Sequence, residues 1–157
     1  MKLALISLNQ VWENKEANCL RVIECLRTIA DTSIDLVIFP EMTLTGFTMN
    51  TEIYAEYSKD SETIHFFADC ALKYNLYIGF WVILKADKKA TNNFIIASPK
   101  GEILADYAKI HPFSYAGEDK YCQRGNRLVS VEIQRVQVGL SICYDLRFPE
   151  MFHEPIN

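Results

Sequence analysis

The chain has 157 residues, of which 50% are hydrophobic and 23% are charged, a composition typical of one soluble globular domain with a hydrophobic core. Its net charge of −4 lacks the basic surplus that attracts nucleic acids and anionic membranes, so we expect neither as a partner. The five cysteines form no C-x-x-C pair, and the apolar run at the N-terminus is too short for a signal-peptide core or a membrane span. These features predict a cytoplasmic protein without a disulfide framework or a zinc site.

Two short apolar runs in the first half of the chain suit buried strands. The first covers residues 2–8 and the second covers residues 35–39. Pro40 ends the second run, because proline cannot donate a hydrogen bond to a neighbouring strand.

Helical spacing of apolar residues follows each of these runs. Asn14 can cap a first helix, whose apolar positions are Cys19, Ile23, Leu26 and Ala30. Asp60 or Ser61 can cap a second helix. Its apolar positions recur at i, i+3, i+4, i+7 and i+8, and they are Ile64, Phe67, Ala68, Ala71 and Leu72.

The second half of the chain is a run of strands. We expect them at about 76–84, 93–97, 102–107, 128–133 and 136–142. A tight turn around Gln134 and Arg135 should join the last two. The order β-α-β-α followed by strands predicts an α/β or α+β layered fold, in which helices cover a sheet within a single domain.

Reactive side chains follow three of the expected strands. Glu41 comes after the second strand, Lys109 ends the strand near 102–107, and Cys143 ends the last strand. Ligand crevices form at strand ends in α/β sheets, so the three side chains could converge on one site. Taken singly, each has a simpler explanation: a cysteine in an apolar strand is usually a core residue, and a lone Glu or Lys is usually solvated or weakly paired.

Other catalytic classes find less support in the sequence. A papain-like Cys–His site would need a partner motif, and none surrounds His65, His111 or His153. No His, Cys and Asp cluster has the spacing of metal ligands. No glycine-rich loop follows a strand in the manner of a nucleotide site. We therefore expect no metal and no cofactor.

Three ordered motifs resemble the nitrilase superfamily of carbon–nitrogen hydrolases, whose members carry a Glu–Lys–Cys triad. The resemblance runs from Met1 to about Glu150. Within the superfamily the motifs look most like the ω-amidase branch, whose members hydrolyse the terminal amide of short dicarboxylic monoamides such as 2-oxoglutaramate. The matching stretches are Phe39-Pro40-Glu41-Met42 with Thr45-Gly46-Phe47, Tyr107-Ala108-Lys109-Ile110-His111-Pro112-Phe113, and Cys143-Tyr144-Asp145-Leu146-Arg147-Phe148-Pro149-Glu150.

The resemblance implies hydrolysis of a non-peptide carbon–nitrogen bond through a Cys143 thioester. Glu41 would act as the base, and Lys109 would stabilise the oxyanion. Because the thiolate is the attacking species, Lys109 and the start of a helix after Cys143 should lower the pKa of Cys143, alone among the five cysteines. The substrate would be a small-molecule amide, and an amide or nitrile of another class is the alternative.

Further roles follow from the same resemblance. Glu118, in the pair Gly117-Glu118, matches a second family glutamate and would position Lys109 or the substrate; a plain loop glutamate is the competing interpretation. The backbone N–H of Tyr144 would help to hold the oxyanion. Arg147 could bind a substrate carboxylate in a bidentate pair, or be a surface ion-pair partner. Gly125-Asn126 matches a glycine-containing turn.

The resembled fold is a four-layer α-β-β-α sandwich, and residues 1–157 would be a single, truncated N-terminal part of it. Pro155 would interrupt the helix that follows the cysteine motif in the family. Two functional classes therefore remain open. The chain is either a portion of a working ω-amidase-like enzyme or a non-catalytic chain that serves as a binding or oligomerising module. In both cases we expect a homo-oligomer, because missing strands would leave apolar surface and a strand edge uncovered.

Overall fold

A five-stranded mixed sheet forms the centre of the computed structural model, which describes residues 1–30 and 32–153. The sheet has the order β1-β2-β3-β4-β5, with parallel pairing from β1 to β3 and antiparallel pairing from β3 to β5. A separate antiparallel pair, β6-β7, follows. The strands are β1 (Leu3–Leu5), β2 (Leu36–Ile38), β3 (Tyr77–Lys85), β4 (Ala90–Ala97), β5 (Ile103–Ala108), β6 (Ser130–Ile133) and β7 (Val136–Gly139).

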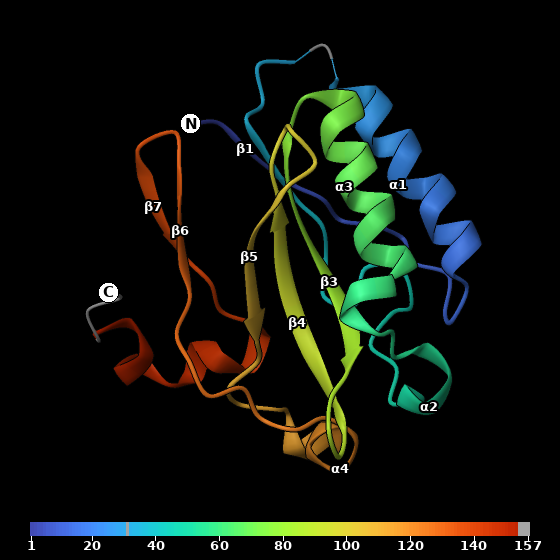
Figure 1. Cartoon of the computed structure of the whole chain (residues 1–157), viewed down its shortest axis with the longest axis vertical. Coiled ribbons are helices and arrows are strands. Elements are labelled where there is room, and N and C mark those ends of the chain that lie inside the picture. Colours follow the sequence, from blue (N-terminus) through green and yellow to red (C-terminus); the bar gives the residue numbers. More distant parts are fainter. Residues whose placement is uncertain (31, 154–157) are drawn as a thin grey trace.

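Helices and the β6-β7 pair cover opposite faces of the large sheet (Figure 1). Helices α1 (Lys15–Ile29) and α3 (Glu62–Tyr74) pack on one face. Short helices α2 (Thr51–Tyr54) and α4 (Glu118–Tyr121) lie in the connections. The helix-sheet-sheet layers confirm the predicted α/β layered fold. No helix in the described ranges has both the length and the apolar character needed to cross a bilayer.

Strand β3 has no polar side chain from Ile78 to Leu84, because both faces of this stretch are buried. Ile78, Phe80 and Val82 pack on the helix side. Trp81 belongs to the second core, which also contains Ile133 of β6, and it stacks on Phe94 of β4 with ring centroids 3.8 Å apart. Gly79 has no room for a side chain, since a Cβ atom there would lie 2.8 Å from the Phe94 ring. The continuous apolar sequence of β3 is therefore explained by two hydrophobic cores, one on each face of the sheet.

The expected helix caps are present. The Asn14 side chain accepts a hydrogen bond from the backbone N–H of Ala17 at 2.9 Å and so caps α1. Of the two candidates for α3, Ser61 is the cap, because its hydroxyl accepts from the N–H of Ile64 at 3.1 Å. Both helices therefore begin where local side-chain chemistry predicts.

The buried faces of the helices differ from the apolar pattern. Helix α1 buries Asn18, Val22 and Leu26, whereas the expected Ala30 is exposed. Asn18 can be buried because its amide is hydrogen-bonded to the backbone of Val11 and Leu44. In α3 the expected Leu72 is wrong as a core residue, since 58% of it is exposed, while Thr63 and Cys70 are buried. Polar residues with partners thus displace apolar ones from the buried face.

Several strands and one helix are also shorter than predicted. The first strand covers only Leu3–Leu5, and the last ends at Gly139 rather than at residue 142. The expected helix after Cys143 is a short 3-10 helix, Cys143–Arg147, followed by a second one that Pro149 begins. The tight turn is confirmed, with positive φ at Gln134 and Arg135. The interruption expected at Pro155 lies outside the described residues.

Candidate active site

The ends of three strands bring Glu41, Lys109 and Cys143 together. Lys109 directly follows β5, and its Nζ lies 2.9 Å from Glu41 Oε1, just beyond β2. The same Nζ lies 2.8 Å from Glu118 Oε2, at the start of α4. The Cys143 thiol, beyond β7, lies near enough to Glu41 for this carboxylate to raise the pKa of the thiol. The four side chains expected to cooperate are therefore neighbours.

Lys109 is a buried cation between two carboxylates. Only 1% of its side chain is exposed, and the Glu118 side chain is fully buried. Burial alone lowers the pKa of Lys109, but the charge of Glu41 and the hydrogen bonds to Glu118 and Glu41 outweigh it and raise this pKa above its ordinary value. Lys109 is thus a permanent positive charge at neutral pH.

The expected low pKa of Cys143 is wrong. Its pKa is raised, first by burial and then by the charge of Glu41, and the opposing charge of Lys109 does not compensate. Lys109 is shared between two carboxylates, so little of its field is left to stabilise a thiolate. In the resting site the thiol therefore keeps its proton, and Glu41 is placed to receive it.

Exposure, not pKa, distinguishes Cys143 from the other cysteines. Burial also raises the pKa of Cys19 and Cys25, that of Cys70 to about 11 and that of Cys122 to about 12. Cys70 and Cys122 are buried and Cys19 and Cys25 are half-buried, whereas Cys143 is exposed.

A left-handed backbone and one buried carboxylate shape the turn that carries the nucleophile candidate. Cys143 has φ +46°, a region that non-glycine residues rarely adopt. The fully buried Asp145 accepts from the N–H of Ile142 at 3.0 Å and from the Tyr107 hydroxyl at 2.7 Å. It also accepts from the N–H of His111 at 2.8 Å. Asp145 thereby ties the turn to the end of β5. Asp145 belongs to the third motif of the sequence, but its role in holding the turn was not predicted.

Asn92 is a second member of the site that the sequence did not predict. Its Nδ2 donates to Glu41 Oε1 at 2.7 Å and to Glu118 Oε1 at 2.9 Å. A signal was present in the sequence, because Asn92 and Asn93 are a polar pair in an otherwise largely apolar strand and buried amides need partners.

Two glycines allow the loops around Lys109. Gly117, with φ +77°, precedes Glu118, whose Oε2 also accepts from the N–H of Phe113 at 2.6 Å. Gly125 donates its N–H to the Lys109 carbonyl at 2.8 Å. A Cβ at Gly125 would lie 2.1 Å from the Ala108 carbonyl oxygen, so no other residue fits there. Glu118 is therefore a buried part of the site, which contradicts a plain loop position.

An open cavity of about 530 Å³ lies beside Cys143, lined by Phe113, Cys143, Tyr144, Leu146 and Arg147. The Tyr144 ring packs on Phe113 with centroids 5.0 Å apart, and Arg147 is exposed at the rim. The cavity thus combines an apolar wall with one cation next to the thiol.

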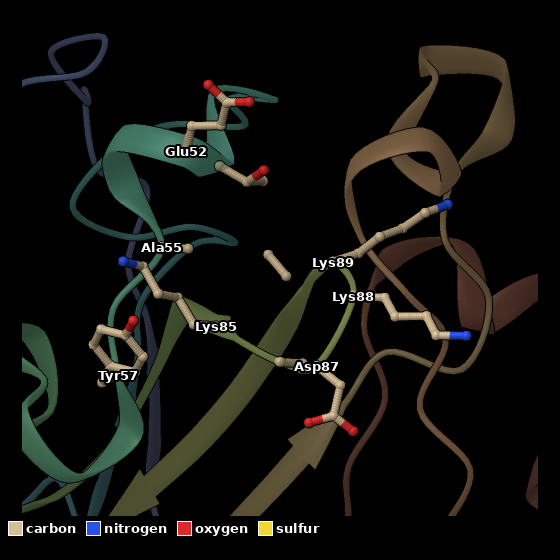
Figure 2. A pocket seen from close by; sticks show the side chains of 10 residues that line it. Glu52, Ala55, Tyr57, Lys85, Asp87, Lys88 and Lys89 are labelled. Atoms are coloured by element: carbon tan, nitrogen blue, oxygen red, sulfur yellow. The ribbon is translucent and has the colours of Figure 1, made fainter.

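A second hollow lies between α2 and the turn from β3 to β4 (Figure 2). Lys85 places its Nζ 4.4 Å from the centre of the Tyr57 ring there. Lys89 donates to the backbone carbonyl of Asp119. None of the predicted site residues lines this hollow, whereas Cys143, Tyr144 and Arg147 line the other cavity.

Comparison with known proteins identifies the family of this chain. Residues 2–154 match the carbon-nitrogen hydrolase family. Omega-amidase YafV from Yersinia enterocolitica is 33% identical over 149 residues, which cover 95% of this chain and 56% of that protein. A 2-oxoglutaramate amidase from Paenarthrobacter nicotinovorans is 33% identical over 129 residues, covering 75% and 44%. The chain thus spans about half the length of the curated relatives that it matches.

Solved structures share the fold. XC1258 from Xanthomonas campestris, a CN-hydrolase superfamily protein with an arsenic adduct in its active site, has a TM-score of 0.87 and 27% identity, covering 94% of this chain and 55% of that one. Nit3 from Saccharomyces cerevisiae gives a TM-score of 0.83 at 24% identity over 96% and 58%, which supports the fold alone. The chain therefore belongs to the carbon–nitrogen hydrolase (nitrilase) superfamily, close to its ω-amidase branch.

Proposed function

We propose that this chain carries the reacting residues of an amidase that hydrolyses the terminal amide of a small dicarboxylic monoamide. The observation that carries the proposal is the contact network in which Lys109 lies within 2.9 Å of both Glu41 and Glu118, beside a Cys143 thiol whose pKa the Glu41 carboxylate raises. A nucleophile, a proton acceptor and a fixed cation are the groups that acyl transfer from an amide requires. The ω-amidase and 2-oxoglutaramate amidase relatives support the substrate class.

In the first step, the Cys143 sulfur attacks the amide carbonyl carbon while its proton passes to Glu41. Because the pKa of Cys143 is raised, the thiol depends on Glu41 to accept its proton. The carbonyl oxygen becomes an oxyanion, which Lys109 and the N–H of Tyr144 stabilise. A single oxyanion donor contributes about 10²–10³ in rate, so Lys109 is a large part of the acceleration.

The remaining steps return every proton. Glu41 donates its proton to the amide nitrogen, the carbon–nitrogen bond breaks, and ammonia leaves a thioester on Cys143. Glu41 then takes a proton from water as the water oxygen attacks the thioester carbon. When the carbon–sulfur bond breaks, the carboxylic acid leaves and Glu41 returns the proton to the sulfur. Glu118 keeps Lys109 in place throughout.

Arg147 is the residue that we assign to the substrate's distal carboxylate. It lies at the rim of the cavity that holds Cys143, and the other lining side chains, Phe113, Tyr144 and Leu146, offer no charge. A guanidinium group can hold a carboxylate through two parallel hydrogen bonds. The cavity thus suits a short chain with an amide at one end and an acid at the other.

Ammonia release tests the proposed function. We would incubate the 157-residue chain with succinamate or 2-oxoglutaramate, in parallel with a chain extended by the remaining part of the Yersinia enterocolitica relative. We expect ammonia from at least the extended chain, its loss in Cys143→Ala, and its retention in Cys25→Ala, which changes a half-buried thiol on α1. Release that survives Cys143→Ala, or no release from any of these proteins, would contradict the proposal.

A further inference from the structure

We propose that Asn92 is a positioning residue that determines which oxygen of Glu41 receives the thiol proton and that keeps Glu118 from competing for it. The inference rests on the proposed role of Glu41 as the base. It assigns a function to an amide on β4 that lies between the two carboxylates of the site.

Two donors bridge the same pair of carboxylates. The Lys109 ammonium binds Glu41 Oε1 at 2.9 Å and Glu118 Oε2 at 2.8 Å. The Asn92 amide binds Glu41 Oε1 at 2.7 Å and Glu118 Oε1 at 2.9 Å. The backbone carbonyl of Asn92 also accepts from the N–H of Lys109 at 2.9 Å. Asn92 is therefore hydrogen-bonded to both carboxylates and to the backbone of Lys109, and its own side chain is almost fully buried in the sheet.

This pattern leaves the two carboxylates unequal. Both oxygens of Glu118 are occupied, Oε1 by Asn92 and Oε2 by Lys109 and the N–H of Phe113. Glu41 Oε1 is occupied twice, but within the described part of the chain no N–H or O–H group donates to its Oε2. Glu41 is also 20% exposed, whereas Glu118 is fully buried. The free Oε2 of Glu41 is thus the acceptor available to the Cys143 thiol.

A neutral amide suits this position because the site already carries two negative charges and one positive charge. Asn92 adds two hydrogen bonds without adding charge. An aspartate there would place a third carboxylate against Glu41, and like charges that close disfavour any further negative charge, including a thiolate on Cys143. An alanine would free Glu41 Oε1 from one of its two donors and let the carboxylate turn.

The test compares Asn92→Asp and Asn92→Ala with Asn93→Ala. Asn93 is the matched control, because it is the next residue of β4, is also buried, and donates to Asp106 instead of to the site. The first measurement is the alkylation rate of Cys143 by iodoacetamide against pH, followed by mass spectrometry of the intact chain. This measurement needs no turnover, so it stays informative if the proposed amidase function fails.

We expect the midpoint of the alkylation profile to move to higher pH in Asn92→Asp, with the rate at pH 7 lowered at least threefold, and to remain in place in Asn93→Ala. One unit of midpoint shift corresponds to about a tenfold loss of thiolate. In the extended chain, Asn92→Ala should lower kcat at least tenfold with little change in KM. A purely structural role would lower the melting temperature but leave the midpoint and kcat unchanged.

Each outcome decides the proposal. Profiles of both Asn92 variants that coincide with that of Asn93→Ala would overturn it. If Asn92→Ala does not melt cooperatively, the alkylation midpoint of the nearly isosteric Asn92→Asp decides whether the proposal holds. A shifted midpoint in a chain that releases no ammonia from any amide would keep the positioning role of Asn92 and reject the amidase function instead.

Discussion

The ammonium group of Lys109 is buried and binds two carboxylates, those of Glu41 and Glu118. Arginine would keep the charge but present a planar fork to two acceptors that now converge on one nitrogen. We expect Lys109→Arg to lower kcat by about 10²-fold or more while the protein still folds. Near-normal turnover would make Lys109 a structural ion-pair partner. The exposed Lys89→Arg is the control, and circular dichroism melting monitors the fold.

Accessibility should make Cys143 the first cysteine to react, although its pKa is raised. The pKa of each of the other four thiols is also raised, and all four thiols are less exposed than Cys143, so accessibility decides the order. Brief iodoacetamide treatment near neutral pH, followed by peptide mass spectrometry, should find Cys143 labelled before Cys25. Because the thiol is mostly protonated, labelling should accelerate as the pH rises above 8. Earlier labelling of a half-buried or buried thiol in folded protein would contradict this.

The role of Arg147 can be separated from general binding by comparing two substrates. Succinamate carries the distal carboxylate, and pentanamide has a similar length without it. If Arg147 pairs with that carboxylate, Arg147→Ala should lower kcat/KM for succinamate by about 10-fold or more and leave pentanamide nearly unchanged. An equal effect on both substrates would return Arg147 to the status of a solvated surface cation.

Among the structural elements, the short turn at Cys143 depends on Asp145, because its carboxylate receives two backbone N–H groups and one hydroxyl in a fully buried position. Asparagine would replace one acceptor by a donor that faces other donors. We expect Asp145→Asn to lower the free energy of unfolding by about 2–4 kcal/mol, and to slow alkylation of Cys143 as the turn loses its anchor. Urea unfolding measures the first effect. The exposed Asp119→Asn should change neither quantity.

Glu56 links α1 to the start of α3 and should make stability depend on pH. Burial raises the pKa of Glu56, but hydrogen bonds from Lys15 on α1 and from Ser61 and Thr63 at the start of α3 lower it overall. A pKa that is lower in the folded than in the unfolded state contributes stability that is complete above about pH 5 and is lost as the pH falls through the folded value. We expect Glu56→Gln to flatten the loss of unfolding free energy between pH 5 and pH 3, measured in urea. The exposed Glu52→Gln should not flatten it.

Local patterns predicted the elements, and long-range contacts decided the rest. The caps at Asn14 and Ser61 and the turn at Gln134 follow from short stretches of sequence, and all three are present. The exposed Leu72 was not predictable, because the buried face of α3 is set by its packing on the sheet. The raised pKa of Cys143 depends on how Glu41 and its neighbours divide one ammonium group, which spacing along the chain does not encode.

The same distinction holds for the site. Motifs gave the three strand-end residues and Glu118, because each stands next to a recognisable stretch of sequence. Asn92 and Asp145 act across 51 and 38 residues of chain, to Glu41 and Tyr107 respectively. A buried polar residue reveals only that it needs a partner, and the partner's identity comes from the folded sheet.

On the scale of the whole molecule, apolar side chains gather at surfaces that a second body could cover. Leu5 is 73% exposed on β1, which is an edge of the large sheet. Leu146 is also 73% exposed, and Phe152 is 53% exposed, both on the turns after Cys143. Unprotected strand edges and apolar patches promote association. The relatives that this chain matches are longer than the part that aligns with it.

We therefore expect the 157-residue chain to self-associate and to hydrolyse amides poorly, because a reacting constellation works well only when its supporting shell is fixed to about 0.5 Å. Light scattering after size exclusion should give a mass that grows with concentration in the micromolar range. Leu5→Lys should reduce this growth, because it places a positive charge at the exposed edge strand β1. Leu72→Lys is the control and should not reduce it, because Leu72 is an exposed leucine on helix α3 and not at a strand edge. Extension by the remaining part of the Yersinia enterocolitica relative should restore both a defined mass and turnover. A monodisperse monomer of the 157-residue chain with robust turnover would show that the helix-sheet-sheet layers described here hold the site without further support.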